Sequence, residues 1–403
     1  MANVLATCTI VAKEALAVLE NMCTFSAAVN RDYETEYTSN QDRGYSPGLT
    51  IQIKKPPKYL YRAGPVANPQ ATVETTIPLT LSQGGNDIFF SAAERTLSLQ
   101  QFQEKVYAAM VPVVNEIDRQ GLTLAQTATF NAVGTVGTPP ATQLAAVDLI
   151  ASANQRLDEL GAPRDRRRTL INGPRMNRFL VSAMSGMFNS QAQLDKQYRS
   201  GLMVDAFGAN IEMDQNVATH TNGTQNVAGT NINGANQTGS SITVVGLGGT
   251  VTRGTIIRLP GVNAVNPVSR VDTGNPAEFV VTADAIIGAT TLNISPAIVT
   301  SGAFQNVTAS PTSGSPFTIN FGAASSSTQC NVLFHKNAFT LACVPLWMPP
   351  EKGVIDSHRE THDGFSVRVV QYYDGVNDNA NMRIDVLFGW AATYPELSCR
   401  VLG

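Results

Sequence analysis

Residues 253–299 carry the strongest structural signal in the chain, with the sequence RGTIIRLPGVNAVNPVSRVDTGNPAEFVVTADAIIGATTLNISPAIV. Short runs in which apolar and polar residues alternate, such as Thr255–Leu259 and Glu278–Thr282, are separated by Gly, Asn and Pro. Such alternation predicts strands with one buried face, and Gly, Asn and Pro favour the turns between them. The stretch belongs to a larger segment, Gln215–Cys330, that contains only six Asp, Glu, Lys or Arg residues. We therefore expect a compact all-β module across this segment.

The residues on both sides of this segment have ordinary charge and mixed helical and strand patterns. The clearest helix is expected at 142–160, with Gly161 at the C′ position and Pro163 beyond it. Apolar spacing also predicts helices at about 9–22, 98–117, 122–131 and 175–186, and Pro112 either kinks the second or begins a new one. Strands are expected at 168–171, 332–341, 365–373 and 382–390. The simplest fold class is α+β, with an all-β domain inserted into a mixed body.

The N-terminal region precedes these elements and has a different pattern. Residues 30–48 are polar and rich in turn formers, which is typical of an extended arm. Alternating runs at 49–54 and 73–81 predict a long two-stranded excursion. Because an isolated two-stranded ribbon is marginally stable in water, we expect the excursion to lie on another surface.

Composition excludes several classes of protein. The chain has 403 residues, of which 43% are hydrophobic and 15% charged, and its formal net charge is −3. A disordered chain combines low hydrophobicity with high net charge, so this length predicts roughly two to three folded domains. The small net charge argues against nucleic-acid binding through a basic footprint. So few charges also suggest a surface covered by other subunits, although the deficit is concentrated in residues 215–330.

Candidate chemical sites are weak. The five cysteines are scattered without metal-ligand spacing, which favours reduced thiols in a cytosol-made protein, and we predict no secretory signal or membrane span. His358 and His362 could bind a metal on a helix, but their surroundings favour solvated loop histidines. Gly246–Gly249 lacks the features of a phosphate-binding loop, and Arg164–Arg168 fits a solvated loop or an intersubunit salt bridge better than nucleic-acid binding. We therefore predict no catalytic residue, cofactor or metal.

A series of short motifs runs through most of the chain. They are Asn30–Tyr33, Leu49–Pro56, Pro112–Asp118, Gly201–Asp205, Phe207–Gly208, Arg253–Ile257, Pro260–Val262, Phe279–Val281, Leu292–Ile294, Phe334–Phe339, Ser366–Val370, Arg383–Gly389 and Tyr394–Glu396. No single motif is specific, but their order resembles the tailed-phage major capsid proteins of the Hong Kong 97 type. The branch that they resemble is the coat protein of Salmonella podophages, which carries an inserted domain.

This resemblance implies a division of the chain into the parts of that capsid fold. They would be the N-terminal arm at 1–45, the E-loop at 46–96, the peripheral domain with its spine helix at 97–141 and 352–391, the axial domain at 142–216, 339–351 and 392–403, and an inserted β-barrel-like domain at 217–338. The related coat protein has an acidic loop in its inserted domain, whereas the matching residues Thr224–Ser240 have no charge. Ionic contacts between capsomers are therefore not expected there.

The resemblance also implies a function. Pentamers and hexamers of the chain would form an icosahedral head around double-stranded DNA, with a scaffolding protein and a portal as partners, assembled in the bacterial cytoplasm and located in the virion. Contacts between subunits would involve Lys54, Lys55, Lys58 and Arg62 in the E-loop, and Asp374, Asn377, Asp378 and Asn381 in a loop near the local threefold axes. Some relatives form isopeptide cross-links from an E-loop lysine, but podophage relatives are held noncovalently, so we expect no cross-linking.

Three other functions remain open from the residues alone. The first is an encapsulin-type shell that loads enzymes instead of DNA. The second is a β-rich adhesin or glycan-binding module, suggested by the Thr, Asn and Gly content of the central segment. The third is an enzyme that uses His358 and His362. The helical segments around the β module and the absence of a predicted signal peptide weigh against the adhesin.

Overall fold

The computed structural model describes residues 12–13, 15, 23–33, 48–67, 69–91, 102–184, 208–320, 322–349, 354–362, 365–377 and 379–403. The helix predicted at 9–22 and the motif Gly201–Asp205 fall largely or wholly outside these residues. The chain divides into two compact units. The first comprises residues 1–53, 77–121 and 340–391, and the second comprises 54–76, 122–339 and 392–403. Each unit is described separately below.

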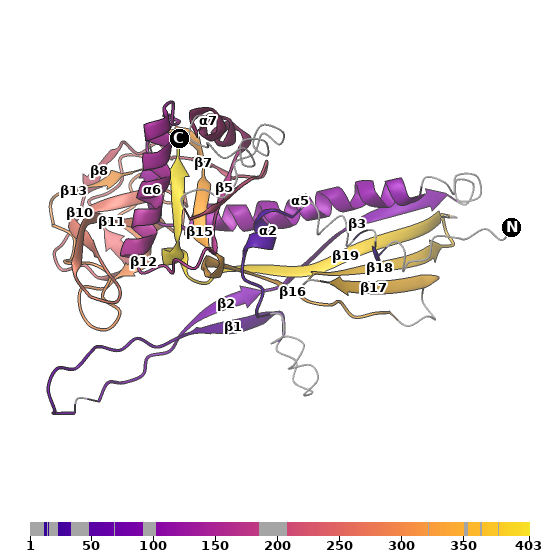
Figure 1. Cartoon of the computed structure of the whole chain (residues 1–403), viewed down its shortest axis with the longest axis horizontal. Coiled ribbons are helices and arrows are strands. Elements are labelled where there is room, and N and C mark those ends of the chain that lie inside the picture. Colours follow the sequence, from indigo (N-terminus) through magenta and orange to yellow (C-terminus); the bar gives the residue numbers. More distant parts are fainter. Residues whose placement is uncertain are drawn as a thin grey trace. The chain divides into compact units, whose positions relative to one another are not determined.

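The first unit is built on a long antiparallel sheet. Its order is β16 (Phe339–Cys343), β19 (Asn379–Ala392), β18 (Phe365–Asp374) and β17 (Asp356–His362), and β3 (Ser82–Ser91) also pairs with β19. Figure 1 shows β3, β19 and β18 running side by side. The strands predicted at 365–373 and 382–390 are therefore confirmed. The predicted loop at His358–His362 was wrong, because this segment is the terminal strand of the sheet and pairs residue by residue with β18.

Helix α5 (Phe102–Ala128) is continuous, with Pro112 in its interior. The separate helix expected at 122–131 was wrong: the same helix continues to Ala128, and Asn131–Gly134 forms strand β4. Proline lacks only its own N–H donor, so a long helix can contain it when neighbouring packing supplies the lost stability. In the first unit, the short helix α2 (Phe25–Ala28) contacts α5 through the buried Asp118 carboxylate. That carboxylate accepts the backbone N–H of Thr24 at 2.9 Å and of Ser26 at 3.0 Å.

The two-stranded excursion is present as β1 (Thr50–Lys55) paired with β2 (Thr75–Thr80). In the first unit its root is buried: Ile51, Ile53, Leu79 and Leu81 form one cluster with Ala342, Val344 and Ala391. The buried positions alternate along β1, as the sequence predicted. The root thus packs on other strands, which is what a marginal two-stranded ribbon requires.

The second unit contains a mixed five-stranded sheet. Its order is β4 (Asn131–Gly134), β20 (Ser398–Leu402), β15 (Asn331–His335), β5 (Arg168–Asn172) and β6 (Asn210–Met213). Helices α6 (Gln143–Glu159) and α7 (Pro174–Met184) pack with it around a common apolar cluster. The predicted boundaries of α6 are confirmed, since Thr142 Oγ1 accepts the N–H of Ala145 and Gly161 has a φ of +79°. The strand expected at 332–341 is instead two strands, β15 and β16, because the 3-10 helix η2 (Lys336–Ala338) interrupts it.

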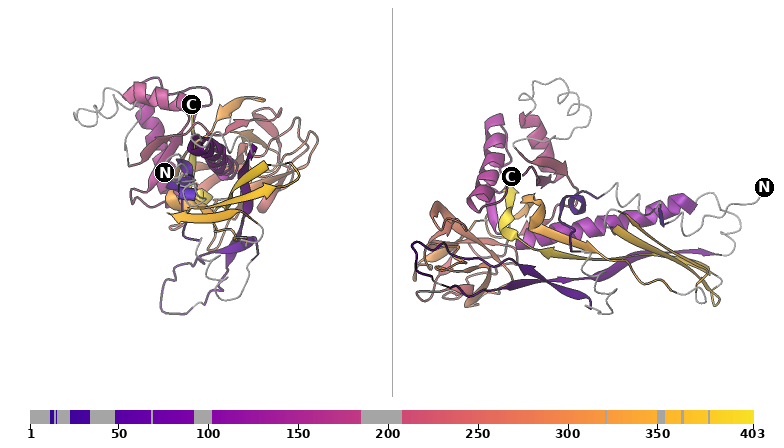
Figure 2. Two further views of the ribbon diagram at one scale, coloured as in Figure 1. Left: turned by 90° about the vertical axis from the view of Figure 1, so that its right-hand side faces the viewer. Right: turned by 60° about the horizontal axis from the view of Figure 1, so that its bottom comes forward.

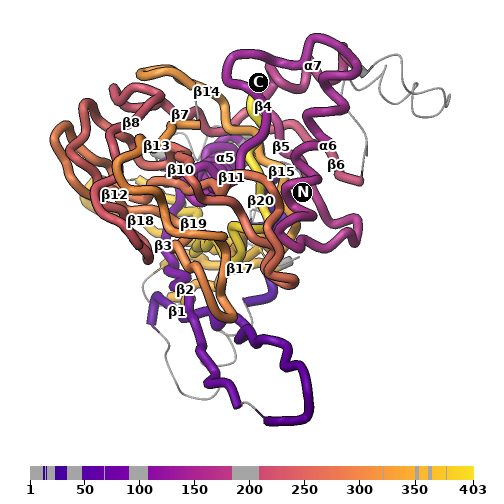
Figure 3. Tube along the Cα trace, turned by 90° about the vertical axis from the view of Figure 1, so that its left-hand side faces the viewer, coloured from indigo at the N-terminus to yellow at the C-terminus, as the bar shows by residue number. Residues whose placement is uncertain are grey.

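A six-stranded antiparallel sheet forms the rest of the second unit. Its order is β8 (Ala228–Asn231), β13 (Pro316–Ile319), β10 (Ile256–Val265), β11 (Asp272–Val281), β12 (Thr291–Ile298) and β9 (Gly239–Thr243), as Figure 3 labels them in part. Strands β7 (Thr219–Thr221) and β14 (Ser327–Gln329) pair with each other where the chain enters and leaves this region. The described elements between Gln215 and Cys330 are all strands, as expected. The core includes Phe279, Phe317 and Ile256, which are fully buried.

The last described element before β20 is the 3-10 helix η4 (Pro395–Leu397). In the described part of the chain, no helix has the length and apolar character needed to cross a membrane.

Candidate assembly surfaces

The loop between β1 and β2 is the most exposed apolar feature of the described chain. Tyr61 is 95% exposed and Val66 is 80% exposed, and Tyr59, Leu60 and Val73 are also exposed. The loop appears in Figure 2 as an extended hairpin. Polar contacts give it a defined shape: the side chain of Gln70 accepts the N–H of Leu60 at 2.8 Å and donates to its carbonyl at 2.7 Å. A shaped loop with uncovered aromatic and aliphatic side chains is suited to burial against another protein surface.

Four cationic residues predicted to contact neighbours lie in this hairpin. Lys54 forms an exposed ion pair with Glu74 at 3.1 Å, and Arg62 donates to the carbonyl oxygens of Gly64 and Val66. Lys55 lies 4.9 Å from the ring centroid of Tyr394, and Lys58 lies 5.9 Å from that of Phe304. Burial lowers the pKa of Lys55, while the nearby Glu396 acts in the opposite direction. Each residue therefore has a partner in its own chain, and contacts to other subunits stay a prediction.

The second group of predicted contact residues lies at the β18–β19 turn. Asp374 Oδ1 accepts the N–H of Val376 at 2.9 Å, and Oδ2 accepts the side-chain amide of Asn377 at 2.7 Å. These hydrogen bonds lower the pKa of Asp374, with the Asn377 amide as the largest cause. Asn381 follows on β19, opposite Tyr372 of β18, and Asp378 lies outside the described residues. Sequence reasoning missed Val376, which is 92% exposed at the tip of this turn.

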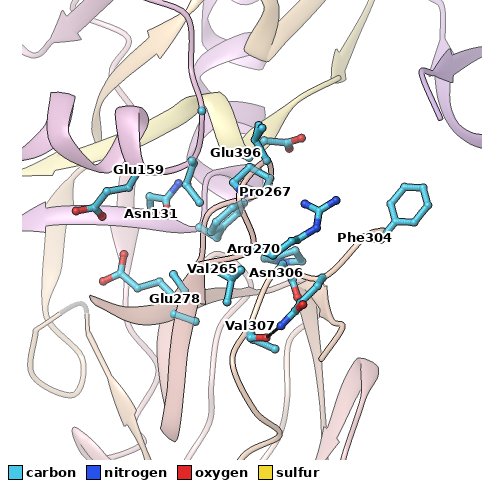
Figure 4. Close-up of a pocket in the computed structure, with 18 of the residues that line it drawn as sticks. Asn131, Glu159, Val265, Pro267, Arg270, Glu278, Phe304, Asn306, Val307 and Glu396 are labelled. Atoms are coloured by element: carbon cyan, nitrogen blue, oxygen red, sulfur yellow. Dashed lines mark hydrogen bonds between the residues drawn. The ribbon is translucent and has the colours of Figure 1, made fainter. Parts of the chain in front are cut away.

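A cavity of about 560 Å³ lies in the second unit and was not predicted from the sequence. Apolar side chains such as Val265, Phe279 and Val307 line it, together with charged groups. Figure 4 shows Glu159 and Glu278 on one side and Arg270 on the other. The lining comes from five separate stretches of sequence, so no local pattern could have indicated it.

Two of the carboxylates that line this cavity are already neutralised. Glu159 lies 3.8 Å from Arg156, and Glu278 Oε1 accepts from Arg258 Nη2 at 2.6 Å. The cations Lys55, Lys58 and Arg270 face one further carboxylate, Glu396. Arg270 donates from Nη2 to the carbonyl of Ala303, and its Nε and Nη1 have no acceptor among the described residues. The cavity therefore combines apolar walls with an excess of positive charge.

Glu278 also joins the two sheets of the second unit. Its side chain is 1% exposed, and its Oε2 accepts the backbone N–H of Ala132 on β4 at 2.7 Å. Since β4 is the terminal strand of the five-stranded sheet, this carboxylate satisfies a donor at the sheet's edge. A reciprocal contact comes from Arg400 on β20, whose buried guanidinium donates to the carbonyl of Gly254 at 2.8 Å. The two sheets thus exchange buried charged contacts.

The remaining candidates from the sequence do not form a reactive site in the described structure. His358 Nε2 lies 3.1 Å from Glu360 Oε2, and no group of three potential metal ligands occurs among the described residues. In the basic cluster, Arg168 is buried and bonds Asp158 at 2.7 Å, and Arg164 bonds the same carboxylate at 2.9 Å. These arginines hold the pKa of Asp158 below its usual range. The cluster therefore contacts its own chain rather than presenting uncompensated charge.

Solved structures with a similar fold come from viral shells. The chain aligns with a structure titled "Mycobacterium phage Che8" at 13% identity, with a TM-score of 0.49 over 94% of this chain and 90% of that one. It aligns with the mature capsid of bacteriophage PhiM1 at 11% identity and a TM-score of 0.40, over 88% and 82%. A virus-like particle from Pyrococcus furiosus aligns at 7% identity and a TM-score of 0.41, over 97% of both chains.

Comparison with known sequences is more decisive. No curated protein matches the chain. The model of the family described as "P22 coat protein - gene protein 5" matches residues 1–403, which is the whole chain. That family consists of structural capsid proteins. The chain therefore belongs to the P22 coat protein family and is a major capsid protein of a tailed bacteriophage, located in the shell of the virion.

Proposed function

We propose that copies of this chain assemble into pentamers and hexamers that close an icosahedral head around double-stranded DNA. Membership of the coat protein family over the whole chain is the observation that carries this proposal. We further propose the Hong Kong 97-type fold, in the branch of the Salmonella podophages. Residues 217–338 would be the inserted domain, and the all-strand character of the described part of this region supports that assignment.

The proposed division of labour follows the predicted regions. Residues 1–45 act as the arm, 46–96 as the E-loop, 97–141 with 352–391 as the peripheral domain, and 142–216, 339–351 and 392–403 as the axial domain. These boundaries stay predictions, because the two compact units cut the chain at different positions. Scaffolding protein and portal are the proposed assembly partners.

The exposed β1–β2 loop supports an assembly role. Burying Tyr61 and Val66 against a neighbouring copy removes apolar surface from water, which favours association. Lys54, Lys55, Lys58 and Arg62 are proposed to add polar contacts there, and Asp374, Asn377, Asp378 and Asn381 to add them near the threefold axes. Each contact is weak, and closure of a shell sums many of them.

Packaged DNA is proposed to meet a wall that does not hold it tightly. A formal net charge of −3 gives no general attraction for phosphates. Sequence-specific contacts to DNA are not proposed.

Expression of the chain with and without a co-expressed scaffolding protein tests this function. We expect electron microscopy to show closed shells with fivefold and sixfold clusters, and particles from infected cells to protect DNA from nuclease. A chain that remains a soluble monomer under both conditions contradicts the proposal. Boiled particles that show covalent ladders on denaturing gels contradict the expectation of noncovalent contacts.

A further inference from the structure

We propose that the β18–β19 turn of one copy inserts into the 560 Å³ cavity of another copy, with Val376 against its apolar walls and the turn's carboxylates beside its cations. This inference rests on the proposed assembly of many copies. It names a contact between unlike surfaces, whereas contacts around a threefold axis bring like turns together.

The cavity has the size and chemistry for such a guest. Pockets of roughly 300–1,000 Å³ hold groups larger than a single side chain, so this one has room for the tip of a turn. Val265, Phe279 and Val307 supply the apolar surface. Lys55, Lys58 and Arg270 against Glu396 leave an excess of two positive charges after the two internal ion pairs are discounted.

The turn has the complementary character. Val376 is 92% exposed, an unusual exposure for an aliphatic side chain at the end of two long strands. The hydrogen bonds from Asp374 to Val376 and Asn377 hold the turn in one conformation, so its docking would cost little ordering entropy. Asp374 and Asp378 place two carboxylates on either side of Val376 in the sequence. The charge of the turn thus matches that of the cavity.

Other exposed apolar segments fit the cavity less well. The tip of the β1–β2 loop, residues 59–66, has Arg62 as its single charge, which the cationic rim would repel. The loop at Ile286 and Ile287 is exposed, but the carboxylate of its Asp284 already accepts the N–H of Arg253 at 2.6 Å. We therefore commit to the β18–β19 turn.

Cysteine cross-linking between two distinguishable copies tests the contact. One copy carries Val376→Cys, and an affinity-tagged copy carries Val268→Cys, a residue that is 83% exposed and lines the cavity. Shells assembled from the mixture are treated with copper phenanthroline. Burial raises the pKa of the native Cys330 and Cys399 thiols, so these contribute little background.

We expect a disulfide-linked pair of one tagged and one untagged chain in shells, and none in dissociated subunits. Its yield should exceed by about tenfold that obtained with Val245→Cys in the tagged copy, since proximity raises the effective thiol concentration. Val245 is a matched control because it is 63% exposed and does not line the cavity.

A charge reversal provides a second readout. Lys58→Glu in the tagged copy should lower the cross-linked yield by about fivefold, because the rim then repels the incoming carboxylates. Lys54→Glu should leave the yield unchanged, since Lys54 is exposed and lies outside the lining of the cavity.

Three outcomes overturn the inference while leaving shell formation intact. They are pairs of Val376→Cys chains linked to each other in place of the mixed pair, a preferred link between Ile286→Cys and Val268→Cys, and shells that show no mixed link. Failure of every variant and of the unmodified chain to form shells contradicts the proposed function instead.

Discussion

At the residue scale, Glu278 shows how one buried carboxylate supports two sheets. It serves the backbone of β4, the guanidinium of Arg258 and the amide of Asn320, which donates at 2.6 Å. No local pattern predicts this role, because the partners are separated in sequence by 20 to 146 residues. The sequence shows only one of six charges in a neutral segment.

The substitution Glu278→Gln should lower the free energy of unfolding by about 2–4 kcal/mol, because it leaves a largely buried arginine without its counter-charge. Urea denaturation of the unassembled subunit at neutral pH measures this change. The exposed pair Lys54–Glu74 is the control, and Glu74→Gln should cost less than about 1 kcal/mol. Equal effects of the two substitutions would show that Glu278 has no special structural role.

His220 gives a pH-dependent prediction. Burial lowers its pKa to about 4, and the positive charge of Arg400 acts in the same direction. Its Nδ1 lies 2.8 Å from Gln126 Nε2, an amide donor, so the neutral ring accepts there. The unfolded chain, with an ordinary pKa of about 6.5, binds the proton more readily between these two values.

Stability should therefore fall as the pH decreases from about 6.5 to about 4, by about 3 kcal/mol in total from this group. Urea denaturation at pH 7 and pH 5 tests this, with His220→Gln as the comparison. The variant should lose part of the pH dependence, and an unchanged difference between pH 7 and pH 5 would refute the role of His220.

At the scale of elements, local signals predicted most helices and strands but not where they join. Thr142 and Gly161 mark the ends of α6 because capping acts within a few residues. The unbroken α5 was not predicted, since Pro112 is a local signal against a helix and the compensating packing is distant in sequence. The break between β15 and β16 also depends on a nonlocal contact, in which Lys336 donates its N–H to the carbonyl of Arg167.

The β1–β2 loop allows a prediction about assembly. Tyr61→Ser combined with Val66→Ser should leave the melting temperature of the subunit unchanged, because both side chains are exposed. Shell formation, followed by light scattering, should slow or stop, since the loop loses the apolar surface proposed to be buried on a neighbour. Val271→Ser, at a residue 63% exposed in the six-stranded sheet region, is the control. Normal assembly of the loop variant would remove this loop from the proposed contacts.

At the scale of the whole molecule, the candidate surfaces were predicted in part. The lysines and the acidic turn came from the resemblance, whereas the cavity and the protrusion of Val376 needed three-dimensional structure. The reason is physical: exposure and cavity walls depend on which distant segments pack together, and composition does not contain that information.

A deletion tests how far the two sheets of the second unit depend on each other. Thr221 and Ser327 are paired directly, so an Asn-Gly turn can join them and replace residues 222–326. We expect the shortened chain to be less stable by several kcal/mol, because Ala132 loses its acceptor and the guanidinium of Arg400 loses the carbonyl of Gly254. Differential scanning calorimetry of both chains provides the measurement. Equal stability would mean that the shared contacts contribute nothing.

Strand β17 has a consequence for the solubility of subunits before they assemble. It is the terminal strand of its sheet, and an open strand edge can template aggregation with other chains. Its residues, Asp356–His362, have polar or charged side chains throughout. Charges on an edge strand disfavour pairing with a second edge, because they would be brought together and lose their hydration. The same coat protein can therefore accumulate to high concentration and still associate through its specific surfaces rather than through unselective sheet growth.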